Sequence, residues 1–124
     1  MAGIARLINS NELDMLLELY THLNPEDPDI SGKTETRDLW LSIYNDPGQF
    51  IFVIEKDGCL VASCTLVTVS NLTRGGRSYG LIENVVTHSN YRKMGYSKAV
   101  FGNGSRGSKR KGLLQSYAAD RKKR

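Results

Sequence analysis

Hydrophobic and polar residues follow two different spacings along this chain, and the change between them marks its elements. Apolar positions recur every three to four residues in the segments 10–23 and 34–44, which predicts two helices. Runs rich in β-branched and aromatic residues predict strands over 4–8, 50–55, 59–69 and 79–87. With the start of a further helix after residue 95, the predicted order is strand, two helices, three strands and a helix.

Turn-forming residues separate these elements. Asn9 or Ser10 can cap the first helix, because a short polar side chain there satisfies a free backbone N–H. Asp57-Gly58 predicts a tight hairpin between the second and third strands, and residues 73–77 are expected to form a loop. On the second helix we expect the apolar positions to be Leu39, Trp40 and Ile43.

Composition indicates one soluble domain. The chain has 124 residues, 40% of them hydrophobic, and its mean hydropathy is −0.38. No apolar run approaches the roughly 20 residues of a membrane span, and the first residues lack the apolar core of a signal peptide. A cytoplasmic location is therefore expected. Cys59 and Cys64 lie five apart in one predicted strand, so we expect free thiols on opposite faces.

Charge divides the chain into two unlike parts. Residues 1–101 carry nine Lys/Arg and twelve Asp/Glu, a net charge of −3, whereas residues 102–124 carry eight and one, a net charge of +7. Glycines at 102, 104 and 107 interrupt the last predicted helix, and each costs about 1 kcal/mol relative to Ala there. They do not form a dinucleotide-binding fingerprint, because no predicted strand precedes them.

These features predict a domain over 1–101 and a basic, Gly-rich tail over 102–124 that is disordered or read out of frame. With freely chosen synonymous codons, a one-base shift of the tail gives an amphipathic helix and then an apolar strand. We therefore hypothesise a one-base insertion near the codon of Phe101.

Residues 82–101 hold the most specific pattern in the chain. A strand runs into a short basic turn, Arg92-x-x-Gly95-x-Ser97, and then into a predicted helix. A glycine lets the backbone approach a ligand, and the unpaired amides that open a helix lie at its positive end. The segment therefore predicts a site for a pyrophosphate group. Without its context the motif is only a strand-turn-helix corner.

The motif resembles the acetyl-CoA-binding segment of GNAT-type N-acetyltransferases, usually Gln/Arg-x-x-Gly-x-Gly/Ala, and the similarity covers residues 4–101. Ser97 departs from the family pattern. The resemblance implies an α/β (α+β) fold with a mixed, mainly antiparallel sheet flanked by helices, of which this chain has the N-terminal half. It implies acetyl-CoA as cosubstrate, no metal, and these binding residues: Val85, Val86, Arg92, Lys93, Met94, Gly95, Tyr96, Ser97 and Lys98.

Glu83 is the candidate catalytic base that the resemblance implies. In the family an amine attacks the thioester directly and must first lose a proton, and Val85 or Val86 would offer a backbone amide to the thioester carbonyl. Strict alternation predicts Glu83 on one face with Tyr79, Leu81 and Val85. The alternative is a solvated carboxylate or the partner of an arginine.

The two histidines and the cysteines have no predicted catalytic role. His88 is expected to make a hydrogen bond or face solvent at the end of its strand, and His22 is expected to face solvent. No cluster of His, Cys, Asp and Glu indicates a metal.

The sequence predicts an N-acetyltransferase that acts on a primary amine of a small molecule or peptide, weakly or not at all in this form. Self-association is expected through the strand 79–87, which would be an exposed sheet edge. The alternative function is a module that binds nucleic acid or another anionic surface through its basic tail, for which only weak, nonspecific binding is expected. No membrane partner is expected.

Overall fold

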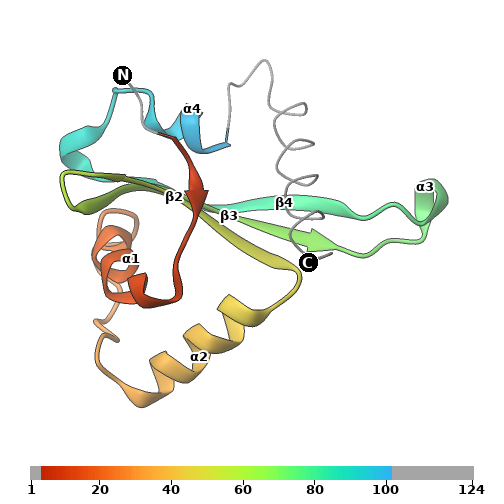
Figure 1. The fold of residues 1–124 in the computed structure, drawn as a ribbon, viewed down its shortest axis with the longest axis horizontal. Coiled ribbons are helices and arrows are strands. Elements are labelled where there is room, and N and C mark those ends of the chain that lie inside the picture. Colours follow the sequence, from red (N-terminus) through yellow and green to blue (C-terminus); the bar gives the residue numbers. More distant parts are fainter. Residues whose placement is uncertain (1–3, 102–124) are drawn as a thin grey trace.

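The computed structural model describes residues 4–101, which form a four-stranded sheet with helices on both faces (Figure 1). The predicted tail, 102–124, lies outside the described residues. The elements, in chain order, are β1 (Arg6–Leu7), the 3-10 helix η1 (Ser10–Glu12), α1 (Leu13–Tyr20), α2 (Thr34–Asn45), β2 (Gln49–Lys56), β3 (Cys59–Val69), α3 (Thr73–Gly76), β4 (Tyr79–Thr87), η2 (Ser89–Tyr91) and α4 (Tyr96–Phe101). This order and the α/β fold class confirm the prediction.

The strands pair in the order β1-β2-β3-β4, and all three pairings are antiparallel. Consecutive strands are therefore neighbours throughout the sheet. Within the described residues β4 lies at one edge, so the expected pairing of this edge with a second chain stays a prediction.

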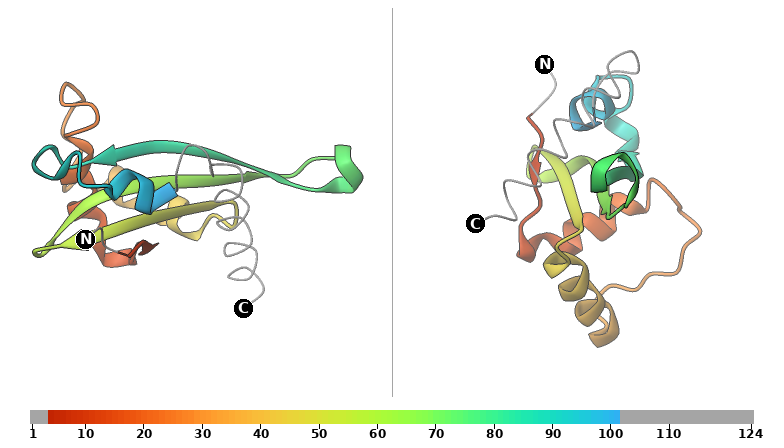
Figure 2. Two further views of the ribbon diagram at one scale, coloured as in Figure 1. Left: turned by 90° about the horizontal axis from the view of Figure 1, so that it is seen from above. Right: turned by 90° about the vertical axis from the view of Figure 1, so that its right-hand side faces the viewer.

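Two layers of helix cover the sheet. On one face α1 and α2 bury Leu16, Leu19 and Trp40 against β2 and β3, and on the other face α4 buries Tyr96 and Val100. Figure 2 shows α4 and α2 on opposite sides of the strands. The chain therefore builds two separate apolar clusters, one on each face of the sheet.

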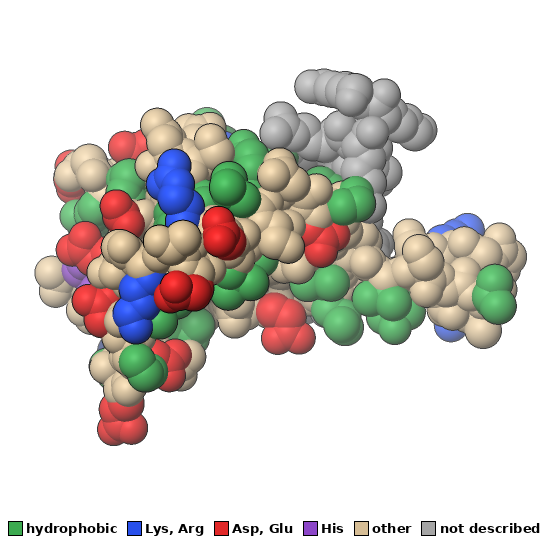
Figure 3. All heavy atoms as spheres, turned by 90° about the horizontal axis from the view of Figure 1, so that it is seen from below, with side chains coloured by type: hydrophobic (Ala, Val, Ile, Leu, Met, Phe, Trp, Pro, Cys, Tyr) green, Lys and Arg blue, Asp and Glu red, His purple; other side chains and the backbone are tan. Residues whose placement is uncertain are grey.

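The hairpin of β3 and β4 projects beyond the helices, with α3 at its tip (Figures 1 and 2). Apolar side chains along this hairpin stay uncovered: Leu72 at the tip is 94% exposed, and Tyr79 and Leu81 are each 45% exposed. Figure 3 shows apolar side chains along the projecting hairpin and acidic side chains spread over the rest of this face.

The hairpin between β2 and β3 confirms the turn prediction. Asp57 and Gly58 both have positive φ, 53° and 79°, as a two-residue hairpin loop of the favoured twist requires. A bulge follows, because Ile54 pairs with Ala62 while Glu55 pairs with Leu60. The extra residue reverses the alternation of side chains, so that Cys59 packs on the same apolar cluster as Cys64. Both thiols are free, but their expected placement on opposite faces was wrong.

A second bulge lies in β4. Thr65 pairs with Glu83 but Ser63 pairs with Val86, so Asn84 and Val85 together oppose one residue of β3. Asn84 has φ of 52°, a left-handed conformation that Asn tolerates better than most residues. Val85 therefore packs toward the α4 face, and its predicted place on one face with Glu83 was wrong.

Three smaller predictions also change. The first strand has two residues instead of five, because only Arg6 and Leu7 pair with β2. The loop 73–77 contains the single turn α3, which is irregular at Arg74 and Gly75. On α2, Trp40 is buried but Leu39 is 55% exposed, because it lies one residue further round the helix.

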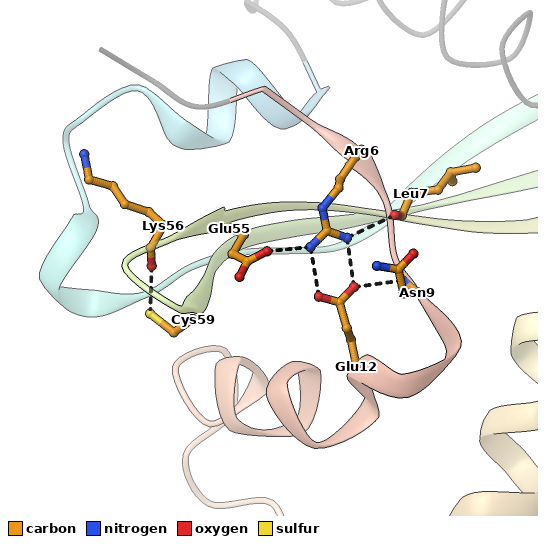
Figure 4. A network of polar contacts seen from close by, with 7 residues as sticks. All are labelled: Arg6, Leu7, Asn9, Glu12, Glu55, Lys56 and Cys59. Atoms are coloured by element: carbon orange, nitrogen blue, oxygen red, sulfur yellow. Dashed lines mark hydrogen bonds and ion pairs between the residues drawn. The ribbon is translucent and has the colours of Figure 1, made fainter.

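An ion-pair network fixes the start of the chain against the sheet (Figure 4). Two nitrogens of Arg6 donate to the two carboxylate oxygens of Glu12 at 2.8 Å each, and one of them also donates to Glu55 at 2.9 Å. Glu12 accepts the backbone N–H of Asn9 at 2.8 Å, which closes the start of η1. The sequence analysis missed this network, because no periodic pattern marks it.

We predict that Glu12→Gln lowers the free energy of unfolding at pH 7 by about 1–3 kcal/mol, measured by urea denaturation. The Glu12 side chain is only 9% exposed, whereas Glu55 is 45% exposed. Glu55→Gln, the matched control, should therefore cost less than about 0.5 kcal/mol. Equal losses for the two variants would contradict this ranking.

The same network gives a pH dependence. Hydrogen bonds from Arg6 lower the pKa of Glu12 from its ordinary value of 4.5. The unfolded chain therefore binds a proton more readily, and the stabilisation is complete above that value and falls as the pH drops through the lowered pKa. Glu12→Gln should flatten the acid limb of the stability curve.

Candidate functional site

A cavity of about 390 Å³ lies where β4 ends, between the turn that follows α1 and the basic turn before α4. It collects residues from three separate segments of the chain. Its lining residues are His22, Leu23, Val85, Val86, Thr87, Arg92, Lys93, Gly95 and Tyr96.

The bulge in β4 forms one wall of this cavity. Since two residues of β4 oppose one of β3 at this point, the regular ladder of hydrogen bonds is interrupted immediately before Val86. Val85 and Val86 both line the cavity, although their side chains pack on opposite faces of the sheet. The backbone therefore passes along the cavity wall at the position where regular pairing fails.

The basic turn forms a second wall. Lys93 and Gly95 both have positive φ, 65° and 85°, so the chain turns sharply before α4. A Cβ atom built at Gly95 would meet nothing within 4 Å, so this glycine faces open space in the cavity. Tyr96, which follows, is 3% exposed and anchors the start of α4 in the core.

The remaining predicted binding residues are Met94, Ser97 and Lys98. Met94 is 56% exposed and does not line the cavity. Ser97 and Lys98 lie in the first turns of α4, and their side chains are outside the described part of the structure.

Arg92 ties the turn to two other segments. Its Nε donates to the carbonyl of Thr87 at 3.3 Å, and its Nη2 donates to the carbonyl of His22 at 3.0 Å. The first bond holds the basic turn against the end of β4, and the second holds it against the turn that follows α1. Arg92 therefore shapes the cavity as well as placing positive charge in it.

His22 is partly exposed, and it also lines the cavity, a placement that its expected solvent-facing position did not include. Its ring stacks on that of His88 with centroids 4.0 Å apart, and its Nδ1 accepts the N–H of Ser89 at 3.3 Å. Partial burial, together with the nearby His88 and Arg92, lowers the pKa of His22 against the opposite effect of Glu18. No sequence signal joins His22 to a turn 67 residues away.

His88 confirms its expectation as a hydrogen-bonding residue at the end of its strand. Its Nδ1 accepts the N–H of Asn90 at 3.1 Å and so caps η2. Its ring also contacts Tyr91 edge-on, with centroids 5.3 Å apart.

Glu83 is exposed and does not line the cavity. It pairs with Thr65, one residue before the bulge, on the face covered by α1. Burial raises the pKa of Tyr20, at the end of α1, and nearby Thr65 and Asn84 oppose this shift. Tyr20 therefore lies near Thr65 and Asn84, the pairing partner and the next residue of Glu83, a placement that the sequence did not predict.

Within residues 4–101, no group of three or more His, Cys, Asp or Glu residues is arranged to hold a metal ion. None of the helices in this range is long and apolar enough to cross a membrane.

Comparison with known proteins shows a consistent pattern. Residues 13–118 match the model of the acetyltransferase (GNAT) family. The chain is 33% identical over 95 residues to glucosamine 6-phosphate N-acetyltransferase of Trypanosoma brucei brucei, a match that covers 77% of this chain and 64% of that protein. The chain thus spans slightly less than two thirds of this curated relative.

Two solved structures have the same fold. A putative acetyltransferase from Agrobacterium tumefaciens is 42% identical with a TM-score of 0.73, over 77% of this chain and 66% of that one. An acetyltransferase from Trypanosoma brucei is 26% identical with a TM-score of 0.70, over 90% and 74% of the two chains.

We predict that Asn84→Val destabilises the fold, because a β-branched residue at positive φ adds roughly 1–2 kcal/mol of strain. Asn84→Gly should be tolerated, since glycine adopts this conformation freely. Urea denaturation measures both, and hydrogen exchange in the paired part of β4 should quicken in Asn84→Val only. If Asn84→Val were as stable as Asn84→Gly, the requirement for a residue that tolerates positive φ at this bulge would be wrong.

Proposed function

Since the chain belongs to the acetyltransferase (GNAT) family, we propose that its cavity binds acetyl-CoA and that its fold serves acetyl transfer to a primary amine. The observation that carries the proposal is the joining of the β4 bulge and the basic turn in one cavity. Each wall is suited to one requirement of the reaction: an interrupted strand ladder, where a backbone amide can face a carbonyl, and a positive, glycine-containing turn for phosphates.

The residues of the turn fit the phosphate end of acetyl-CoA. Open space faces Gly95, so backbone can approach a ligand there without obstruction. Lys93 lines the cavity and Arg92 is fixed beside it by two hydrogen bonds. Their positive charges and the amides that open α4 favour an anion. The side-chain roles predicted for Met94, Ser97 and Lys98 remain proposals, of which the exposed Met94 has the least support.

The bulge fits the thioester end. Acetyl-CoA supplies an activated acyl group, and the protein must stabilise the charge that grows on the carbonyl oxygen during transfer. We propose that the backbone N–H of Val85 or Val86 donates to this oxygen. Val85 has the stronger support, because it lies in the bulge and has no pairing partner in β3, whereas Val86 pairs with Ser63.

Glu83 is proposed as the base that removes a proton from the amine, through water. It lies one residue before Asn84 on the α1 face, and Val86 faces the same side after the bulge. An exposed carboxylate can exchange protons with solvent during turnover. The alternative role, a solvated carboxylate without catalytic function, predicts that Glu83→Gln leaves the rate unchanged.

The name of the curated relative indicates which amines should be tested first as acceptors. The curated relative is named a glucosamine 6-phosphate N-acetyltransferase, so amino sugar phosphates belong in the first set of amines to be tested. Because the fold hosts many acceptors, amino sugars, polyamines and peptide amines complete the set.

We predict that Gly95→Val abolishes CoA binding measured by isothermal titration calorimetry, because the new side chain projects into the open space of the cavity. Gly32→Val is a matched control: Gly32 has φ of 75°, is equally free of neighbours and lies outside the cavity. It carries similar backbone strain and should keep wild-type affinity. If Gly95→Val bound CoA as the control does, the assignment of the turn would be wrong.

We further propose that residues 102–124 are read in a shifted frame and that this 124-residue form is a weak enzyme. The sharp rise in charge and glycine content after residue 101 supports the proposal. The family match continues to residue 118, so an in-frame tail is the competing outcome. Sequencing the locus and its neighbouring bases distinguishes the two.

We predict that removing one base near the codon of Phe101 increases acetyl transfer to the amine set by several orders of magnitude, because positioning supplies about 7–11 kcal/mol in well-oriented reactions. In that longer protein Glu83→Gln should lower kcat/KM about 100-fold or more. Strong transfer by the 124-residue form would show that the present chain is sufficient. An unfolded, inert longer protein would contradict the shifted frame.

A further inference from the structure

His22 joins two parts of the molecule that are far apart in the sequence. Its Nδ1 accepts the N–H of Ser89 at 3.3 Å, and its carbonyl accepts Arg92 Nη2 at 3.0 Å. Its ring lies 4.0 Å from that of His88. The turn that follows α1 is thus held to the segment 88–92 by three contacts of one residue.

These contacts also determine which ring nitrogen carries the proton. A neutral imidazole has one donor and one acceptor nitrogen, so a ring whose Nδ1 accepts a hydrogen bond carries its proton on Nε2. The groups around the ring favour this neutral form: partial burial, His88 and Arg92 lower the pKa of His22, and Glu18 alone opposes them. Lys93 adds positive charge to the same cavity.

The Nε2–H group has no hydrogen-bond partner within the part of the chain that the structure describes. His22 nevertheless lines the cavity together with Arg92, Lys93 and Gly95. An unused donor therefore stands in a cavity whose other polar groups are suited to an anion. Two nitrogens of Arg92 already donate to backbone carbonyls, so another hydrogen-bond donor in the cavity would help to bind an anion.

We propose that His22 is a further binding residue of this cavity, which donates from Nε2 to a phosphate oxygen of CoA while its Nδ1 and carbonyl hold α1 to the turn. The inference rests on the proposed binding of CoA. It assigns a ligand contact to the turn that follows α1, a segment that the sequence motif does not include.

Two substitutions separate the two sides of the ring. The amide of Asn can place an oxygen near the position of Nδ1, so His22→Asn keeps an acceptor for Ser89 but loses the donor. The longer amide of Gln can place an N–H near the position of Nε2, so His22→Gln keeps the donor. We expect His22→Asn to weaken CoA binding about tenfold, as the loss of a hydrogen bond to a charged group does, and His22→Gln to stay within about threefold of wild type.

His88→Asn is the matched control. It removes the other ring of the stack but retains an acceptor for the N–H of Asn90, and His88 does not line the cavity. Its CoA affinity should stay within about threefold of wild type. Calorimetry with CoA measures all four proteins, and thermal unfolding shows whether each is folded.

A measurement on the wild-type protein covers the case in which a variant does not fold. CoA should shift the 15N resonance of His22 Nε2 and leave that of His88 Nε2 nearly unchanged. A wild-type protein that binds CoA without this shift, or a folded His22→Asn that binds CoA as wild type does, would overturn the role of His22 alone. Absence of CoA binding by the wild-type protein would instead overturn the proposed function, and this inference with it.

Discussion

The candidate site depends on one extra residue in β4. Without the bulge at Asn84, alternation would place Val85 on the same face as Glu83, and the strand would continue its regular pairing with β3. The bulge sends Val85 toward α4 and Val86 toward α1, so both apolar clusters extend to the end of β4. It also interrupts the ladder of hydrogen bonds beside the cavity. A residue at positive φ is thus stabilised by packing on both faces of the sheet, as expected where local strain serves a site.

The cavity also requires that three segments of the chain keep their positions around it. Arg92 contacts the end of β4 and the end of α1 through backbone carbonyls, and His22 returns a contact to Ser89. Because the acceptors of Arg92 are backbone carbonyls, these hydrogen bonds do not depend on the side chains of Thr87 and His22. The positive charge of Arg92 therefore serves two purposes: it stabilises the local fold through hydrogen bonds and contributes to the electrostatic field of the cavity.

The opposite edge of the sheet, where β1 lies, has a different stabilising feature. Arg6 links the short β1 to Glu12 of η1 and Glu55 of β2, so that two residues of strand suffice to hold the start of the chain. This network lies apart from the cavity, so its loss should change stability without altering the cavity lining.

The sequence by itself determined the order of the elements, the tight turn at Asp57-Gly58 and the basic turn at 92–95, because hydrophobic spacing and turn chemistry act over a few residues. Only the tertiary structure decided on which face a residue lies after a bulge, as Val85 and Cys59 show, since one added residue reverses every later position. It alone brought His22 and Tyr20 to the site and gave Arg92 its structural contacts. These relations join residues that are tens of positions apart, and only the packing of α1 against the sheet brings them together.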